Sequence, residues 1–312
     1  MKLVALITGF VPEFPPLNTK KDLKDVMANI IVSQPHGFCF GINRAIKIAQ
    51  DTAKKYPNKN IYFLGQLVHN QHVIDWLEQQ LSIKTVSFLD QIPKSSVVIL
   101  QAHGVAPQIY HQAKNKNLVI IDASCPLVLK SHQTVKNLIG KEKQVIFLCN
   151  KIDHEETIGV VGEAPDFVTP ITLENISSFE IKDPQNTIVI TQTTLSTLET
   201  KKALDFLKNK YPKLIVLPHI CQATTERQQA IIKLAKKHHF VIVVGSPTSA
   251  NSNSLKTVSE SVGATSYIVD NASQIKSEWF SGQKNIVISS GASTPEGILN
   301  QVIEKIEQFT HR

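Results

Sequence analysis

The sequence predicts an α/β protein built from three small domains arranged around one shared site. Short runs of β-branched residues alternate with amphipathic helical stretches, which is typical of sheets with largely parallel strands. Three of the four cysteines each follow an apolar run and precede a helical stretch. They stand roughly 90 residues apart, about the length of one small α/β unit. Together these observations indicate three similar units.

The elements follow from the spacing of apolar residues along the chain. Short apolar runs predict strands, in chain order, at 30–33, 96–100, 118–121, 145–148, 187–190, 214–217, 240–244 and 285–289. Apolar residues recurring at helical spacing predict helices at 44–55, 129–138, 230–237 and 298–309. The alternation of the two kinds of element favours parallel sheets covered by helices.

The predicted domain boundaries lie close to the three cysteines. We expect a first domain over 41–125, a second over 126–218, and a third formed by 29–40 together with 219–312. Residues 1–28 are excluded from the fold. Because Met27 stands just before the first confident strand, this segment is interpreted as a disordered extension or as an artefact of the chosen start site.

Composition limits the function classes. Of the 312 residues, 42% are hydrophobic and 19% charged, which suits a folded globular protein. The net charge of +7 is spread along the chain and favours a small phosphorylated ligand. No basic motif interleaved with aromatic residues supports nucleic-acid binding. No apolar run is long enough for a membrane span, and the cysteines do not form a disulfide framework, so we expect a cytoplasmic protein.

Three cysteines share one local context. Cys39 lies in GFCFGINRAI, Cys125 in DASCPLV and Cys221 in ICQATTERQ. Ligands gather beyond the carboxyl ends of parallel strands, and the helix dipole at this position favours the thiolate form that binds metal. We therefore expect three thiolates at one point. Cys149, in QVIFLCNK, is interpreted as a buried structural thiol instead.

Three explanations of the cysteines are possible on these grounds. All four can be core residues, since buried free cysteines are common. A structural zinc site normally shows closely paired cysteines, and this chain has none. An iron–sulfur cluster usually takes four cysteine ligands. With three, one iron is left open to a substrate, which suits catalysis.

Polar residues after the apolar runs are the candidates for ligand contacts. Three histidines at strand ends are expected to bind an anion: His69, His103 and His154. Gly104 and Gly159 would let the backbone approach that ligand. Glu156 is a candidate proton donor. The alternative is that these are ordinary surface or core side chains.

Hydroxyl and amide side chains complete the set of candidates. Thr193 lies in TQTTLS, Ser249 and Asn251 lie in SANSNSL, and Ser293 lies in GAST. They are placed to hold a substrate hydroxyl and phosphate oxygens, or simply to cap the helices that follow. No phosphate-binding Walker loop or dinucleotide-binding glycine motif is present.

These motifs, taken in order, carry a specific resemblance. The chain resembles the hydroxymethylbutenyl diphosphate reductase family, also called LytB, from about residue 29 to residue 306. The matching segments are GFCFGINRAI, LVHNQHVID, AHGVAP, DASCPLV, DHEETIGVVGE, TQTTLS, ICQATTERQ, NSNSL and GAST. Each one alone is a weak signal, whereas all nine in order are highly specific.

The resemblance implies a fold, a cofactor and a reaction. It implies three domains in a pseudo-threefold arrangement around a 4Fe–4S cluster held by Cys39, Cys125 and Cys221. The implied reaction is the reductive dehydroxylation of (E)-4-hydroxy-3-methylbut-2-enyl diphosphate to isopentenyl and dimethylallyl diphosphate, the last step of the non-mevalonate isoprenoid pathway. A ferredoxin or flavodoxin is the implied electron donor.

The resemblance also implies roles for individual residues. Glu156 would give a proton to the leaving hydroxyl, Thr193 would orient that hydroxyl, and His154 would place the substrate and relay protons. The residues implied to hold the diphosphate are His69, His103, Ser249, Asn251 and Ser293.

Three positions depart from the family pattern. Ala250 replaces a serine, Glu155 replaces a proline beside the acid, and His36 replaces an arginine. These departures fit a divergent orthologue, which we favour because the proposed ligands and acid are kept, or a paralogue with another substrate preference. Rival classes are a non-catalytic cluster or diphosphate sensor, a zinc-binding structural protein and a thiol hydrolase.

Overall fold

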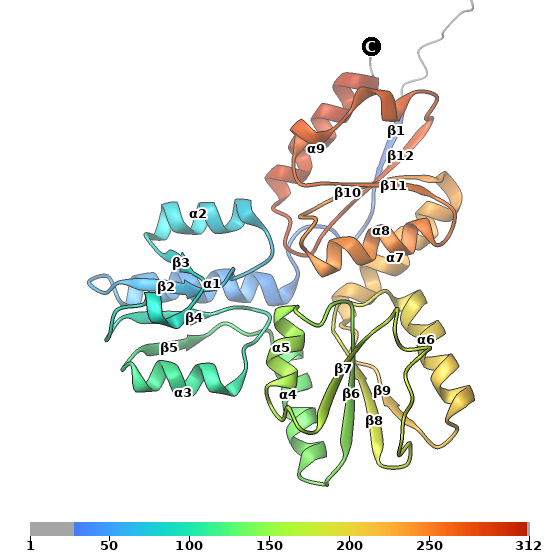
Figure 1. The fold of residues 1–312 in the computed structure, drawn as a ribbon. Coiled ribbons are helices and arrows are strands. Elements are labelled where there is room, and N and C mark those ends of the chain that lie inside the picture. The colour runs from blue at the N-terminus through green and yellow to red at the C-terminus, as the bar shows by residue number, and fades with distance from the viewer. Residues whose placement is uncertain (1–27, 311–312) are drawn as a thin grey trace, which may run out of the picture.

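The computed structural model describes residues 28–310. Within them the chain forms three four-stranded sheets, and all strand pairs are parallel. Helices cover both faces of each sheet, and the three resulting domains lie around a common centre (Figure 1). The predicted extension at 1–28 lies, apart from Ala28, outside the described residues.

The first domain is built on the sheet with strand order β3-β2-β4-β5. Its strands are β2 (Ile61–Leu64), β3 (Lys84–Val86), β4 (Val97–Leu100) and β5 (Val119–Asp122). Its helices are α1 (Phe40–Lys55), α2 (Gln71–Leu81) and α3 (Pro107–Asn115). All residues of β2 and β4 are buried, as expected for central strands covered on both faces.

The second domain has the strand order β7-β6-β8-β9. Its strands are β6 (Gln144–Cys149), β7 (Val168–Thr172), β8 (Thr187–Thr191) and β9 (Ile215–Leu217). Its helices are α4 (Pro126–Ile139), α5 (Glu155–Val161) and α6 (Thr197–Lys210). Because β6 and β8 are neighbours, the loops that follow them emerge at the same edge of the sheet.

The third domain joins the first described strand to the last part of the chain. Its strand order is β1-β12-β10-β11. Its strands are β1 (Asn29–Val32), β10 (Phe240–Val244), β11 (Thr265–Val269) and β12 (Asn285–Ser290), and its helices are α7 (Gln222–His238), α8 (Ala250–Glu260) and α9 (Glu296–Thr310). Asn29 lies opposite Asn285 in the pairing of β1 with β12, and β1 ends at Val32, before the loop that leads to Cys39.

Helices begin earlier than their apolar periodicity predicts. α1, α4 and α7 begin directly after Cys39, Cys125 and Cys221, which are their N-cap residues. The predicted starts at 44, 129 and 230 were therefore wrong by several residues. In α7 the reason is physical: Arg227 and Gln228, on its inward face, are buried polar residues that give no apolar signal.

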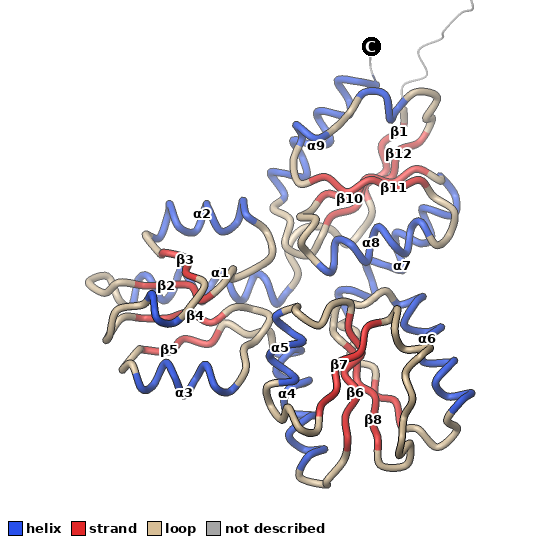
Figure 2. The backbone as a smooth tube through the Cα atoms, in the orientation of Figure 1, coloured by secondary structure: helices blue, strands red, loops and turns tan. Residues whose placement is uncertain are grey.

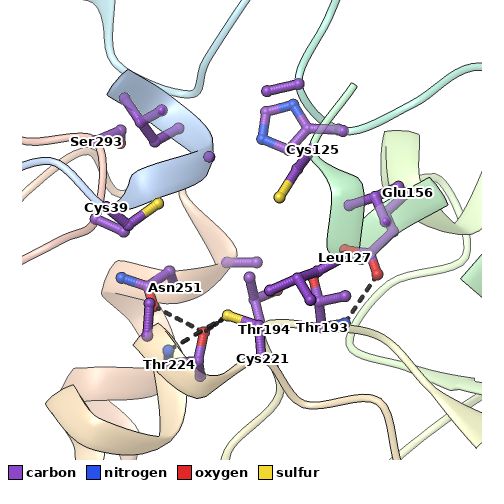
Figure 3. A pocket seen from close by; sticks show the side chains of 18 of the residues that line it. Cys39, Cys125, Leu127, Glu156, Thr193, Thr194, Cys221, Thr224, Asn251 and Ser293 are labelled. Atoms are coloured by element: carbon purple, nitrogen blue, oxygen red, sulfur yellow. Dashed lines mark hydrogen bonds between the residues drawn. The ribbon is translucent and has the colours of Figure 1, made fainter. Parts of the chain in front are cut away.

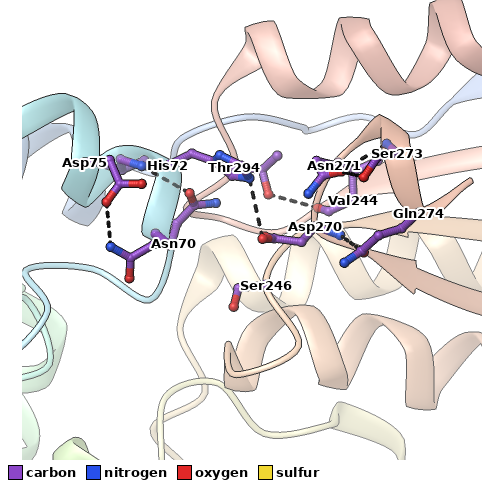
Figure 4. A network of polar contacts seen from close by, with 12 residues as sticks. Asn70, His72, Asp75, Val244, Ser246, Asp270, Asn271, Ser273, Gln274 and Thr294 are labelled. Carbon is purple, nitrogen blue, oxygen red and sulfur yellow. Dashed lines mark hydrogen bonds and ion pairs between the residues drawn. The ribbon is translucent and has the colours of Figure 1, made fainter.

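Polar contacts join each pair of domains. Between the first and third domains, Nε2 of His72 lies 3.4 Å from Oδ2 of Asp270 (Figure 4). Between the second and third, Oγ of Ser254 donates to the carbonyl of Thr194 over 2.6 Å. Between the first and second, Nε2 of Gln108 donates to the carbonyl of Gly162 over 3.3 Å. Figure 2 shows that loops and helix ends, rather than strands, lie where the three domains meet. None of the described helices is long and apolar enough to cross a membrane.

Candidate active site

The three predicted cluster cysteines meet at the centre of the molecule. Each caps the N-terminus of a different helix, and one helix comes from each domain. Their sulfur atoms point into the same space (Figure 3). This space belongs to a cavity of about 730 Å³, including its opening to solvent, that all three cysteines line. A helix start thus brings each thiol to the shared site.

The surroundings of the sulfur atoms fit a bound metal cluster. The backbone of α1 approaches them so closely that a Cβ atom on Gly41 would lie 2.8 Å from Sγ of Cys125 and 3.8 Å from Sγ of Cys39. The backbone N–H of Thr224 donates to Sγ of Cys221 over 3.3 Å. Convergent thiols with an N–H donor beside one sulfur are the donor set that iron–sulfur clusters use.

The acidity of these thiols differs from the prediction. We expected the helix dipole to favour thiolates, yet burial raises the pKa of both Cys125 and Cys221, although backbone N–H groups act in the opposite direction. Desolvation therefore outweighs the helix terminus, and this prediction was wrong for the two residues. Metal binding would have to release their protons.

Cys149 is separate from this site. It ends β6, is fully buried, and its Sγ donates to the carbonyl of Ile171 over 3.5 Å. Burial raises its pKa to about 11. These are the properties of a structural thiol.

The three predicted histidines form a cluster on the cavity wall. The rings of His69 and His103 are stacked with centroids 4.0 Å apart, and the ring of His154 lies edge-on to both. Burial, then repulsion from His69 and His154, lowers the pKa of His103 well below its usual value. Burial, then repulsion from His69, lowers that of His154 to about 4. His103 and His154 are therefore neutral at pH 7.

Glu156 is a buried carboxyl group held by one residue. Its side chain is almost fully inaccessible, with 1% exposure. The backbone N–H and the hydroxyl of Thr193 each donate to one of its oxygens over 2.8 Å (Figure 3). Burial raises the pKa of Glu156 to about 7, even though both hydrogen bonds from Thr193 act to lower it. Glu156 can therefore carry and release a proton near neutral pH.

The remaining hydroxyl and amide candidates lie on the third-domain side of the cavity. Ser249 is the N-cap of α8 and accepts a hydrogen bond from the backbone N–H of Ser252, so the capping alternative applies to it. The buried Nδ2 of Asn251 has no partner. Oγ of Ser293 donates to the carbonyl of His69 over 3.2 Å. An unpartnered amide at a cavity wall is a donor available to a polar ligand.

The structure brings all eleven predicted site residues to one cavity. Its lining includes Cys39, His69, His103, Cys125, His154, Glu156, Thr193, Cys221, Ser249, Asn251 and Ser293. Ala250, one of the departures, lines it too, whereas His36 is not among its lining residues.

The role predicted for two glycines was wrong, and one residue of the site was not predicted. A Cβ on Gly104 would lie 2.9 Å from Nε2 of His132, and Gly159 is similarly close to that ring, so both glycines make room for His132 and not for a ligand. Thr224 was not predicted from the sequence. It contacts Cys221, and its hydroxyl donates to Oδ1 of Asn251 over 3.4 Å. Its signal was a hydroxyl residue three positions after a helix-capping cysteine.

Comparison with known proteins identifies the family. Residues 30–307 match the family of LytB proteins. The chain belongs to the LytB family. Its fold class, three small α/β domains, is confirmed by a LytB-type enzyme of known structure, the E-1-hydroxy-2-methyl-but-2-enyl-4-diphosphate reductase from Plasmodium falciparum. That structure has a TM-score of 0.83 and 32% identity, and the match covers 89% of this chain and 87% of that chain.

Two LytB relatives are similar over most of their length. The 4-hydroxy-3-methylbut-2-enyl diphosphate reductase of Acidothermus cellulolyticus is 38% identical over 295 residues, which are 93% of this chain and 84% of that protein. The protein of the same name from Bacillus licheniformis is 39% identical over 293 residues, which are 91% and 92% of the two chains.

Proposed function

We propose that this LytB protein reduces (E)-4-hydroxy-3-methylbut-2-enyl diphosphate to isopentenyl and dimethylallyl diphosphate, as the last step of the non-mevalonate pathway. The observation that carries the proposal is the position of Glu156. A proton-bearing carboxyl group lines the same cavity as three convergent thiols and a cluster of histidines. Both relatives above bear the name of this reductase.

Cys39, Cys125 and Cys221 would hold a 4Fe–4S cluster through one thiolate each. When bound, such a cluster supplies electrons one at a time and an iron that can take an oxygen ligand. The chain contributes the thiols, the close backbone of Gly41 and the N–H donor of Thr224.

Side chains from the first and third domains would orient the diphosphate. His69 and His103 approach from the first domain, and Ser249, Asn251 and Ser293 from the third. The free Nδ2 of Asn251 and the unpartnered Nδ1 of His103 are buried polar atoms that gain a partner when an anion binds. His154 would place the reacting end, since it is the N-cap of α5 and lies two residues before Glu156.

Glu156 would protonate the leaving hydroxyl group. Two electrons and two protons enter the reaction: the C–O bond breaks, one proton leaves with the hydroxyl as water, and a C–H bond forms at either end of the allyl unit. This choice of carbon gives the two products. Thr193 holds the carboxyl group through both oxygens and would orient the hydroxyl that departs.

The electron donor and the cellular location of the protein remain predictions. No nicotinamide-binding motif is present in the sequence. We therefore propose that a one-electron carrier such as ferredoxin or flavodoxin delivers the electrons, and that the protein acts in the cytoplasm.

The test is turnover by anaerobically purified protein with dithionite and a viologen as reductant. We expect consumption of the allylic diphosphate and formation of both products, with a rate that falls as pH rises through about 7 because Glu156 loses its proton. Glu156→Gln should lower turnover at least about 100-fold. An exposed control, Glu260→Gln, should leave it unchanged. A wild-type protein with a full cluster and no turnover would reject the proposed reaction.

A further inference from the structure

Glu155, one of the departures from the family pattern, contacts His69, a proposed ligand of the diphosphate. Its Oε2 lies 3.1 Å from Nε2 of His69. His69 lines the central cavity, whereas Glu155 lines a second cavity between α5 and the first domain. Glu155 thus reaches His69 from outside the central cavity.

The contact is close, but it is not a formed hydrogen bond. Nε2 of His69 is buried and has no hydrogen-bond partner among the described residues, although Oε2 of Glu155 lies 3.1 Å away. Hydrogen bonds of this kind often tighten only when a ligand is bound.

The charges around His69 single out Glu155. Burial alone would raise the pKa of Glu155, but its contact with His69 outweighs burial and holds that pKa at about 2. His103 and His154 face His69 from the loops before α3 and α5, and both are neutral at pH 7. In the same loop, Lys151 lowers the pKa of His154 and Asp153 raises it. Glu155 is therefore the charged group in direct contact with the His69 ring.

We propose that Glu155 is a positioning residue that keeps His69 protonated and oriented for the diphosphate. This inference rests on the proposed function, which gives His69 its anionic ligand. A carboxylate in contact with a histidine stabilises the imidazolium form, and a ring hydrogen-bonded on one side presents its other side in a fixed direction. The wild-type protein would then take up fewer protons on anion binding than a variant that lacks the Glu155 carboxylate.

The test counts protons taken up on binding of inorganic diphosphate to the cluster-loaded protein. Calorimetry in two buffers of different ionisation enthalpy gives this number at pH 7.5. Glu155→Gln removes the charge, and Glu155→Pro removes the contact as well; proline suits this first position of α5, so both should fold. We expect each variant to take up about one proton more than the wild type, and affinity at pH 8 to fall about tenfold.

A matched control uses another carboxylate–histidine pair. Asp270→Asn breaks the contact with His72 (Figure 4), and neither residue lines the central cavity. We expect this variant to show the same proton uptake and the same affinity as the wild type. Equal proton uptake in wild type and both Glu155 variants, or unchanged affinity at every pH, would overturn the inference. Neither readout involves turnover, so failure of the proposed reaction would show separately, as a wild-type protein that binds the anion and does not reduce the substrate.

Discussion

At the scale of single residues, the site depends on a carboxyl group kept in an unfavourable environment. Glu156 is buried, and only Thr193 donates to its oxygens among the described residues. Additional hydrogen-bond donors would keep the Glu156 carboxylate ionised. The absence of any donor would leave a buried acid without hydrogen-bond partners. Two hydrogen bonds from one threonine leave its pKa at about 7, which is the range in which an acid works best near neutral pH.

This arrangement has a cost in stability that depends on pH. A glutamic acid in the unfolded chain loses its proton near pH 4.5, whereas Glu156 in the folded protein loses it near pH 7. Raising the pH between these values therefore favours unfolding, and the full cost, on the order of 3 kcal/mol, is present above pH 7.

Glu156→Gln should remove that cost. At pH 8 we expect the variant to be more stable than wild type by about 1 to 3 kcal/mol, while below pH 4.5 the two should unfold alike. Anaerobic thermal unfolding at both pH values measures the difference, with Glu260→Gln as the exposed control. A variant less stable than wild type at pH 8 would mean that the carboxylate stabilises the fold.

Residue types at the site were predictable, but their contacts were not. The motifs identified His69, Glu156 and Thr193, because hydroxyl, imidazole and carboxyl groups followed apolar runs. The pairing of Glu156 with Thr193 depends on β6 and β8 being neighbours, and the contact of Glu155 with His69 depends on how two domains meet. Neither relation is encoded in local sequence spacing.

At the scale of elements, three helix starts build the cluster site. The N-terminal turns of α1, α4 and α7 carry the cysteines and point toward the same cavity. Gly41, in the first turn of α1, has the role of a spacer. Its missing side chain leaves the room that the sulfur atoms of Cys125 and Cys39 occupy.

Gly41→Ala should prevent cluster assembly without unfolding the protein. The added Cβ would lie 2.8 Å from Sγ of Cys125, closer than real Cβ contacts allow. We expect iron per chain to fall by more than half, with an unchanged far-ultraviolet circular dichroism spectrum. Gly297→Ala in α9 is the control, since a Cβ there meets nothing within 4 Å. Full iron loading of the Gly41 variant would contradict this prediction and would mean that the backbone of α1 shifts to accommodate the added methyl group.

Elements with a polar inward face were the hardest to predict. α7 buries Arg227, whose guanidinium donates to the carbonyls of Pro35 and Gly37 over 3.0 and 2.8 Å and so fixes the loop before Cys39. α8 turns Asn251 and several serines inward. Such faces lack the apolar period that marks a helix. β7 was missed because it contains Pro170, which its edge position tolerates.

At the scale of the whole molecule, three similar domains each bring one cysteine to the centre. This much followed from the sequence, because the carboxyl ends of parallel strands and the helices after them face one edge of each sheet. The orientation of the domains did not follow from it. It depends on contacts between domains, such as those of Gln108 with Gly162 and of Ser254 with Thr194.

The most direct test of the account is iron content in four single Cys→Ser variants. Wild-type protein purified without oxygen should hold about four irons per chain. Variants of Cys39, Cys125 and Cys221 should each lose most of this iron, because each thiol lines the shared cavity. The variant of Cys149, a buried thiol outside that cavity, should keep it. Zinc in place of iron, or iron lost only with Cys149, would contradict the proposed three-cysteine cluster and with it the reductase mechanism.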